Sequence, residues 1–178
     1  FIGGTKLLEA AHVKDLLSLL RVAANPQDDI AWMRFLTLWN GVGDVGASRL
    51  TSELIALESL EARCARLERH GKVSPAAILI LKQLSILQHE VQQCIGLAVD
   101  ALTEQLAQNY QNQDWARRVK DFDLVKQLAQ KHGALGEFLE EYVLEPISVS
   151  EVERASDQDV VTLITVHSAK GTEQDRKS

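Results

Sequence analysis

Residues 9–24 read EAAHVKDLLSLLRVAA, and this stretch decides the class of the fold. Its apolar residues recur at spacings of three and four, at Val13, Leu16, Leu17, Leu20 and Ala24. That periodicity predicts an amphipathic helix with one apolar face. The helix is expected to end at Asn25, because the residue before a proline avoids the helical conformation and Pro26 follows.

Similar patterns recur along the chain, so the fold is expected to be mainly α. Asp28 or Asp29 is expected to cap the next helix, and Gly71 to end another. Ser74 and Pro75 are typical of an N-cap followed by the first helical residue. Further helices are predicted over residues 30–39, 47–57, 60–69, 115–132 and 134–144, with 76–110 as one helix or as two that break at Gly96.

Composition narrows the classes of function. The 178 residues are 46% hydrophobic and 25% charged, which is typical of a soluble globular protein. The net charge of −6 is unlike that of a dedicated duplex-binding module, so nucleic-acid contact would need a local patch or backbone amides. The longest apolar runs are too short to span a membrane, so no membrane partner is expected. Cys64 and Cys94 lack a CxxC spacing and are interpreted as reduced thiols in the cytosol.

The end of the chain differs in character. Residues 160–166 form an apolar, β-branched run that predicts a buried strand of a parallel sheet, after a polar loop over 148–159. A single strand cannot pair its own backbone groups, and the one other strand candidate is the two or three residues at Phe1. The remaining strands are therefore expected to lie outside this chain, which also lacks an initiator methionine.

The segment after the predicted strand reads Thr165-Val166-His167-Ser168-Ala169-Lys170-Gly171-Thr172-Glu173. A polar, glycine-containing loop at the carboxyl end of a strand is a common ligand site in α/β proteins, although a solvated turn after an edge strand is the alternative. The order of residues closely resembles motif V of the UvrD/Rep/PcrA-like superfamily 1 DNA helicases. Weaker likenesses to this family precede it in the right order, including Gly3-Gly4, Val13-Lys14-Asp15 and Gly41-Val42-Gly43-Asp44.

The resemblance implies an architecture. In this family a helical 2B subdomain interrupts the RecA-like motor domain 2A. Residues 1–15 would be a fragment of 2A, residues 16–149 the helical 2B-like insertion, and residues 150–178 the returning 2A strand with motif V. The expected fold is thus mainly α, a helical subdomain flanked by fragments of a RecA-like α/β domain, with hinges near Asp15 and in the loop 148–159.

The resemblance also implies a function for the parent protein, an ATP-dependent 3′–5′ DNA helicase of the bacterial cytosol. It would use ATP and Mg²⁺ and act on single-stranded DNA and duplex junctions. Lys170, Gly171 and Glu173 would contact ATP, and Thr165 and His167 would lie near the single strand. Thr172 stands where the family has leucine, and the wholly polar residues 174–178 also depart from its pattern.

The chain by itself is expected to be inactive. It has no G-x-x-x-x-G-K-[ST] phosphate loop, so it offers no lysine for the β- and γ-phosphates. No catalytic residue, resident cofactor or metal site is therefore expected in it. The unpaired sheet edge at 160–166 would promote a non-physiological dimer.

A second site is expected in the helical part. Gly41-Val42-Gly43 is similar to the glycine turn of helix-hairpin-helix elements, which present backbone N–H groups to a DNA phosphate. Arg49 is the nearest cation, and the other candidates are Lys6, Lys14 and Arg34. The alternative is an interhelical turn that needs glycine for its backbone geometry alone.

Other side chains are given structural interpretations. Trp32, Trp39 and Trp115 are of a type that stacks on bases, but the helical spacing of the first two with Phe35 favours core packing. The histidines outside motif V show no metal-ligand spacing and are expected at the surface or at helix ends; they are His12, His70, His89 and His132. Two other classes of protein remain open, a RecB- or AddA-like helicase–nuclease subunit and a non-enzymatic helical interaction module.

Overall fold

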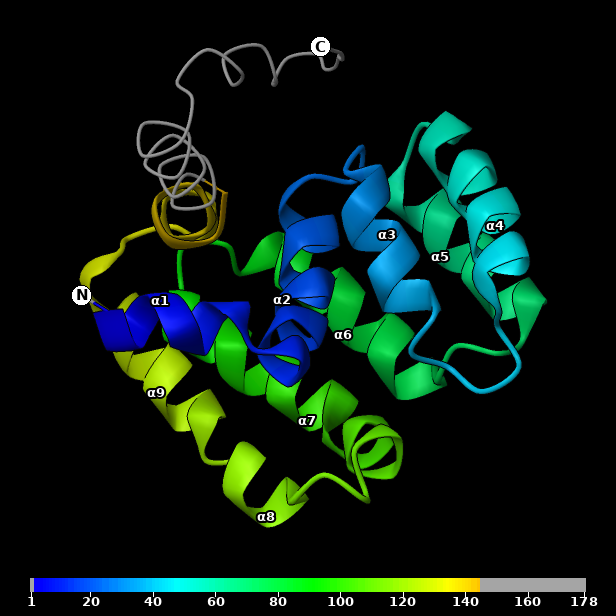
Figure 1. Cartoon of the computed structure of the whole chain (residues 1–178). Coiled ribbons are helices and arrows are strands. Elements are labelled where there is room, and N and C mark those ends of the chain that lie inside the picture. Colours follow the sequence, from blue (N-terminus) through cyan, green and yellow to red (C-terminus); the bar gives the residue numbers. More distant parts are fainter. Residues whose placement is uncertain (1, 145–178) are drawn as a thin grey trace, which may run out of the picture. The chain divides into compact units, whose positions relative to one another are not determined.

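The structure, a computed structural model, describes residues 2–144 and the side chains of residues 6–141 (Figure 1). The chain divides into two compact units, Phe1–Phe138 and Leu139–Ser178, and of the second only the π-helical turn η2 (Leu139–Leu144) is described. Every regular element within residues 2–144 is helical, which confirms the expectation of a mainly α fold. The predicted strand 160–166 lies outside the described residues.

The first unit consists of packed helices joined by short turns. In chain order they are α1 (Ile2–Glu9), α2 (Ala11–Ala24), α3 (Asp29–Leu36), α4 (Asp44–Ala56), α5 (Leu60–His70), α6 (Pro75–Ile86), α7 (Val91–Asn109), α8 (Trp115–Arg118), α9 (Asp121–Leu128), the 3-10 turn η1 (Ala129–Lys131) and α10 (Leu135–Phe138). None of the helices within residues 2–144 has the length and apolarity that a membrane crossing requires.

Helix α2 forms the centre of this unit. It packs against α1, α3, α6, α7 and α10, so apolar residues are buried on all its sides and not on one face alone (Figure 1). Its least exposed apolar side chains are Val13, Leu16, Leu17, Leu19, Leu20 and Val22. Burying a leucine stabilises a fold by about 1.5–3 kcal/mol, so this stretch supplies a large share of the core.

The predicted starts and stops are confirmed where side chains make them. Asp28 caps α3, because its Oδ1 accepts a 3.0 Å hydrogen bond from the N–H of Ala31. Gly71 ends α5 in the left-handed conformation at φ 83°. Ser74 precedes Pro75, and its hydroxyl accepts from the N–H of Ala76 at 3.2 Å.

Two predictions about the chain's path are wrong. Residues Ile2–Glu9 form α1, so the strand candidate beside Phe1 is absent from the described residues. Residues 76–110 form two helices, but they separate at residues 87–90, and Gly96 lies inside α7. Tertiary hydrogen bonds hold this break: the N–H of Leu135 donates to Gln88 O at 2.7 Å, and Gln88 Nε2 donates to Ala23 O at 3.2 Å.

The expected helix over 115–132 is also interrupted, because α8 ends at Arg118 and α9 begins at Asp121. Residues 134–144 divide into α10 and the π-helical turn. His12 lies at the start of α2, a helix end as expected, but it is buried, at 2% exposure, because Asp121 and Arg118 supply polar partners inside the unit. His70, at the end of α5, and the exposed His89 agree with the prediction.

The predicted core packing of Trp32 and Trp39 is confirmed. Trp32 and Trp39 are buried and pack edge-to-face on Phe35, with ring centroids 6.1 and 5.9 Å apart. Cys64 and Cys94 are buried free thiols.

Candidate nucleic-acid interface

The turn between α3 and α4 carries the glycines that the sequence singled out. Val42 is buried and anchors the turn, and its N–H donates to Trp39 O at 3.1 Å. Gly41 has φ 86°, a left-handed conformation that side chains disfavour, so its identity follows from backbone geometry. The structure thus accounts for the first glycine of the turn without any ligand.

The next two glycines have no such explanation. Gly43, the N-cap of α4, has φ −92° and ψ −177°, which any residue can adopt. A Cβ added at Gly43 or at Gly46 would meet no atom within 4 Å. Glycine in a helix costs about 1 kcal/mol relative to alanine, so Gly46 weakens α4 without a packing reason. What the two glycines provide is an open approach to the backbone N–H groups of the first turn of α4.

Lys72 is a cation that the sequence did not place beside this turn. A Cβ on Gly41 would lie 3.5 Å from Lys72 Cε and from its Nζ, so the ammonium group lies against the α3–α4 turn. Lys72 belongs to the loop between α5 and α6, and Figure 1 shows that loop next to the turn. Only a long-range contact reveals this pairing, because 31 positions separate the two residues and no local pattern links them.

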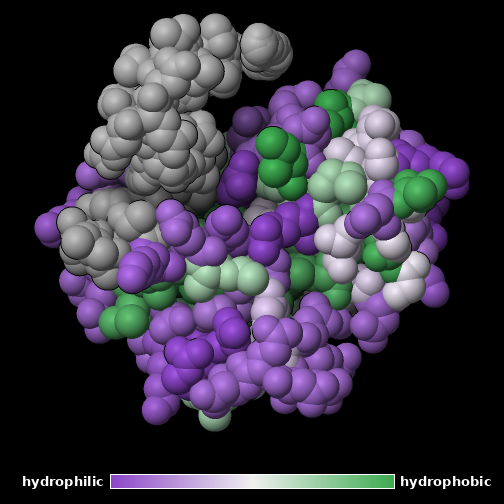
Figure 2. Space-filling model, viewed as in Figure 1, coloured by the Kyte–Doolittle hydropathy of each residue, from purple (hydrophilic) through white to green (hydrophobic). Residues whose placement is uncertain are grey.

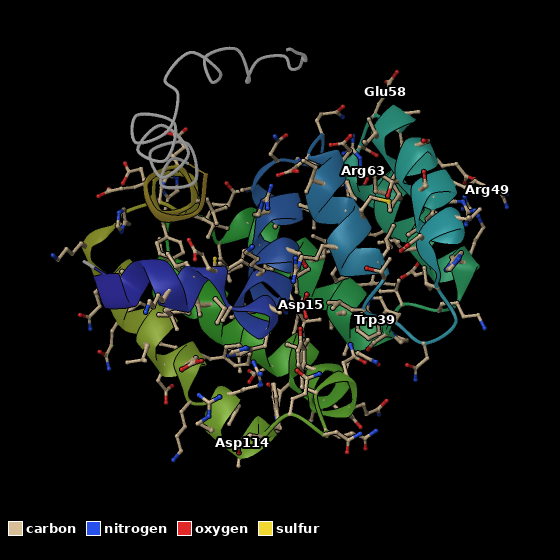
Figure 3. All side chains as sticks on the ribbon, in the orientation of Figure 1. Asp15, Trp39, Arg49, Glu58, Arg63 and Asp114 are labelled. Atoms are coloured by element: carbon tan, nitrogen blue, oxygen red, sulfur yellow. The ribbon has the colours of Figure 1, made fainter. Side chains whose placement is uncertain are left out.

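Neighbouring helices hold the turn in place. Asn109 Nδ2 donates to Leu38 O at 3.1 Å, and Gln105 Nε2 donates to Asn40 Oδ1 at 3.3 Å, so the end of α7 fixes the backbone of the turn. At the other end of α4, the buried guanidinium of Arg63 donates from Nε to Leu54 O at 2.9 Å and from Nη2 to Leu57 O. Figure 3 labels Arg63 at this junction.

The other cations considered from the sequence have different surroundings. Arg49 is exposed and projects from the outer side of α4, five residues beyond its first residue (Figure 3). Lys6 and Lys14 are exposed on α1 and α2. Arg34 is already engaged, because its Nε donates to Oδ1 of the buried Asp15 at 2.7 Å. Within the described part of the chain, neither Arg49 nor Lys72 forms an ion pair.

The electrostatics of the turn favour an anion, with one opposing group. The N-terminus of α4 has no side-chain cap, and the partial positive charge of a helix N-terminus attracts anions. Asp44, the first residue of α4, lowers this attraction. Figure 2 shows that apolar residues on the face in view lie in separate groups divided by hydrophilic ones.

The residues of the motif V segment lie outside the described residues; they are Thr165, His167, Lys170, Gly171 and Glu173. Among the described side chains, no group of three or more His, Cys, Asp or Glu could hold a metal ion.

The chain is similar, over almost its whole length, to a class of bacterial proteins, the ATP-dependent DNA helicases. It is 25% identical to the ATP-dependent DNA helicase PcrA of Staphylococcus epidermidis and 25% identical to PcrA of Bacillus subtilis, each over 97% of this chain. It is 29% identical to DNA helicase II of Escherichia coli over 96% of this chain. These matches confirm the resemblance stated from the residues.

The chain spans about a quarter, 26%, of the length of these curated relatives. No family model and no solved structure matches it.

Proposed function

We propose that this chain is part of an ATP-dependent DNA helicase. Residues 16–149 would be its helical 2B-like subdomain, and residues 1–15 and 150–178 would belong to the RecA-like domain 2A. The similarity to PcrA and DNA helicase II over 96–97% of the chain supports this assignment. A coincidental motif in a helical interaction module would not extend over the whole chain.

We infer that the helical unit contacts duplex DNA through the α3–α4 turn. The observation that carries this inference is the pair Gly43 and Gly46, whose missing side chains leave the first turn of α4 open with no backbone or packing requirement. A DNA phosphate would accept hydrogen bonds from these N–H groups, as anions do at helix N-termini. Lys72 beside the turn would add a charge contact to the same or the next phosphate.

Few phosphate contacts are involved, so binding should depend weakly on salt. One helix N-terminus with Lys72 and Arg49 predicts a slope of log K against log salt of about −1 to −3. This mode of contact explains how a chain with a net charge of −6 would bind DNA.

The motor role would fall on the motif V segment. By resemblance, Lys170, Gly171 and Glu173 would face ATP, and Thr165 and His167 the single strand. The parent protein would hydrolyse ATP with Mg²⁺ in the cytoplasm and move in the 3′–5′ direction.

Binding of this chain to a fluorescein-labelled duplex with a 3′ single-stranded tail tests the proposal. Anisotropy is measured from about 20 to 200 mM salt, and ATP turnover is measured alongside. We expect binding at low salt with the shallow slope given above, and no turnover, because the chain has no phosphate loop. An absence of binding at the lowest salt concentration would contradict the duplex contact and favour a helical interaction module.

A further inference from the structure

A buried histidine joins three segments of the helical unit. His12 of α2 is 2% exposed, and both of its ring nitrogens have charged partners. Nε2 lies 2.8 Å from Oδ2 of Asp121 on α9, and Nδ1 lies 3.2 Å from Nη1 of Arg118 on α8. The imidazole therefore sits between a carboxylate and a guanidinium.

These partners fix the protonation state of the ring. A guanidinium has only donors, so Nδ1 of His12 must accept the hydrogen bond from Arg118. Nε2 then carries the proton and donates it to Asp121. The observed geometry is that of the neutral imidazole. A protonated imidazole carries a proton on both nitrogens and cannot accept from Arg118.

Arg118 holds the neighbouring segment through three contacts. Besides donating to His12, it donates from Nε to Gln113 O at 2.6 Å, and its Cζ lies 5.6 Å from the centroid of the Tyr110 ring. Tyr110 in turn stacks on Trp115, with centroids 6.3 Å apart. Trp115 also packs edge-to-face on Phe122 of α9, with centroids 5.9 Å apart. The guanidinium of Arg118 and the ring of Trp115 thus both hold α8 against the rest of the unit.

Other aromatic and charged groups lie around the His12 ring. Tyr110 at the end of α7 faces the ring at a centroid distance of 6.1 Å, and Phe122 of α9 at 5.8 Å. Behind Tyr110 lies Asp15 of α2, which accepts from the Tyr110 hydroxyl and also binds Arg34 of α3. A protonated His12 ring would carry a positive charge and would repel the Arg118 guanidinium.

We propose that His12 is an acid-sensitive latch whose protonation displaces Arg118 and releases residues 111–120 from the helical unit. This segment carries the exposed cations Arg117 and Lys120, so its release would move two positive charges relative to the rest of the helical unit. The displacement is confined to the Arg118 side of the ring, because Asp121 keeps its hydrogen bond to Nε2 of His12 in both protonation states.

Hydrogen exchange tests the latch. Protection factors of residues 111–120 are measured at pH 8 and pH 5.5 in the unmodified chain, in His12→Gln and in His89→Gln. Glutamine at position 12 keeps a donor for Asp121 and does not titrate, and His89 is an exposed histidine that serves as the matched control. We expect acid to lower protection about tenfold or more in the unmodified chain and in His89→Gln, and to have no such effect in His12→Gln. An equal acid response in His12→Gln, or none in the unmodified chain, overturns the proposal.

A second measurement needs no variant. In an NMR titration of the unmodified chain, the His12 ring proton and the Trp115 indole N–H should shift with the same midpoint. Different midpoints would show that the ring titrates without moving the segment, and they would overturn the latch.

Discussion

The hydroxyl of Tyr110 donates a 2.5 Å hydrogen bond to Oδ2 of Asp15, across 95 positions of sequence. Oδ1 of the same carboxylate accepts from Arg34 Nε at 2.7 Å. Asp15 is 6% exposed, so its charge is stabilised by these two partners more than by water. One buried carboxylate thus joins α2, α3 and the end of α7.

Tyr110→Phe removes one of the two partners. A hydrogen bond to a charged group contributes about 1.5–3 kcal/mol, so we expect the free energy of unfolding to fall by that amount. Urea denaturation measures it. In a double-mutant cycle with Asp15→Asn, the two losses should be non-additive, since both act on the same bond. Thr37→Ala, which removes an exposed hydroxyl bonded to its own helix, is the control and should change stability by less than about 0.5 kcal/mol. Additive losses in the cycle would contradict the coupling.

Stability should also fall in alkali through Cys94. Burial, and then the charge of Glu90, raise the pKa of its thiol from 9.0 to about 11. Above pH 9 the unfolded chain loses this proton while the folded chain keeps it, so stability is full below pH 9 and decreases towards pH 11. Urea midpoints between pH 8 and 10.5 should therefore fall less steeply for Cys94→Ala than for the unmodified chain. Parallel profiles would show that the thiol does not contribute. Burial also raises the pKa of the Cys64 thiol, which therefore acts in the same direction in both proteins.

The parts of the fold that the sequence predicted are those with local causes. Asp28, Gly71 and Ser74 act on their own helix ends, so a linear pattern reveals them. The break at residues 87–90 has no proline or glycine, and Gln88 binds α2 and α10 from far along the chain. A tertiary contact of this kind leaves no periodic signal.

The same distinction between local patterns and long-range contacts applies to the candidate site. The glycine turn was visible because glycine spacing is local, but its two explanations could not be separated without φ values and neighbours. Lys72 was missed because its position beside Gly41 depends on how the α5–α6 loop packs against the α3–α4 turn. The burial of His12 was not predicted, because its partners Arg118 and Asp121 lie more than 100 positions later.

Arg63 should contribute more to the free energy of unfolding than its neighbour Arg66 does. Arg63→Met removes the Arg63 donor from Leu57 O and one of the two donors from Leu54 O, which also accepts from the N–H of Leu57 at 3.2 Å. We therefore expect a loss of about 1–3 kcal/mol in the free energy of unfolding. Arg66→Met is the matched control. Arg66 pairs with the half-buried Glu53 at 2.6 Å, and ion pairs near the surface contribute less than about 1 kcal/mol. Thermal or urea unfolding compares the two variants. Losses of equal size would show that the carbonyl contacts of Arg63 do not stabilise the fold.

Lys72→Gln should weaken binding to duplex DNA by the same factor whatever the base sequence of the duplex. Removal of one phosphate contact lowers the magnitude of the salt slope by about 1, and anisotropy titrations at several salt concentrations measure this. Lys131→Gln removes the same charge from an exposed position at the end of η1 and should leave the slope unchanged. If the two variants behave alike, the effect is one of net charge and not of the α3–α4 turn.

Gly46→Ala should separate stability from binding. Alanine is favoured over glycine in a helix and its Cβ would meet no atom within 4 Å, so we expect the free energy of unfolding to rise by up to about 1 kcal/mol. The same methyl group would cover the approach to the first turn of α4, so the affinity for duplex DNA should fall several-fold.

Gly136→Ala, in α10, is the matched control, because its Cβ also meets no atom within 4 Å and it is distant in sequence from the turn. It should leave affinity unchanged. Gly41→Ala should instead destabilise the fold by about 1–2 kcal/mol, since its φ of 86° is unfavourable for a side chain. A Gly46→Ala chain that is more stable and binds DNA normally would show that the open first turn of α4 has no part in DNA contact.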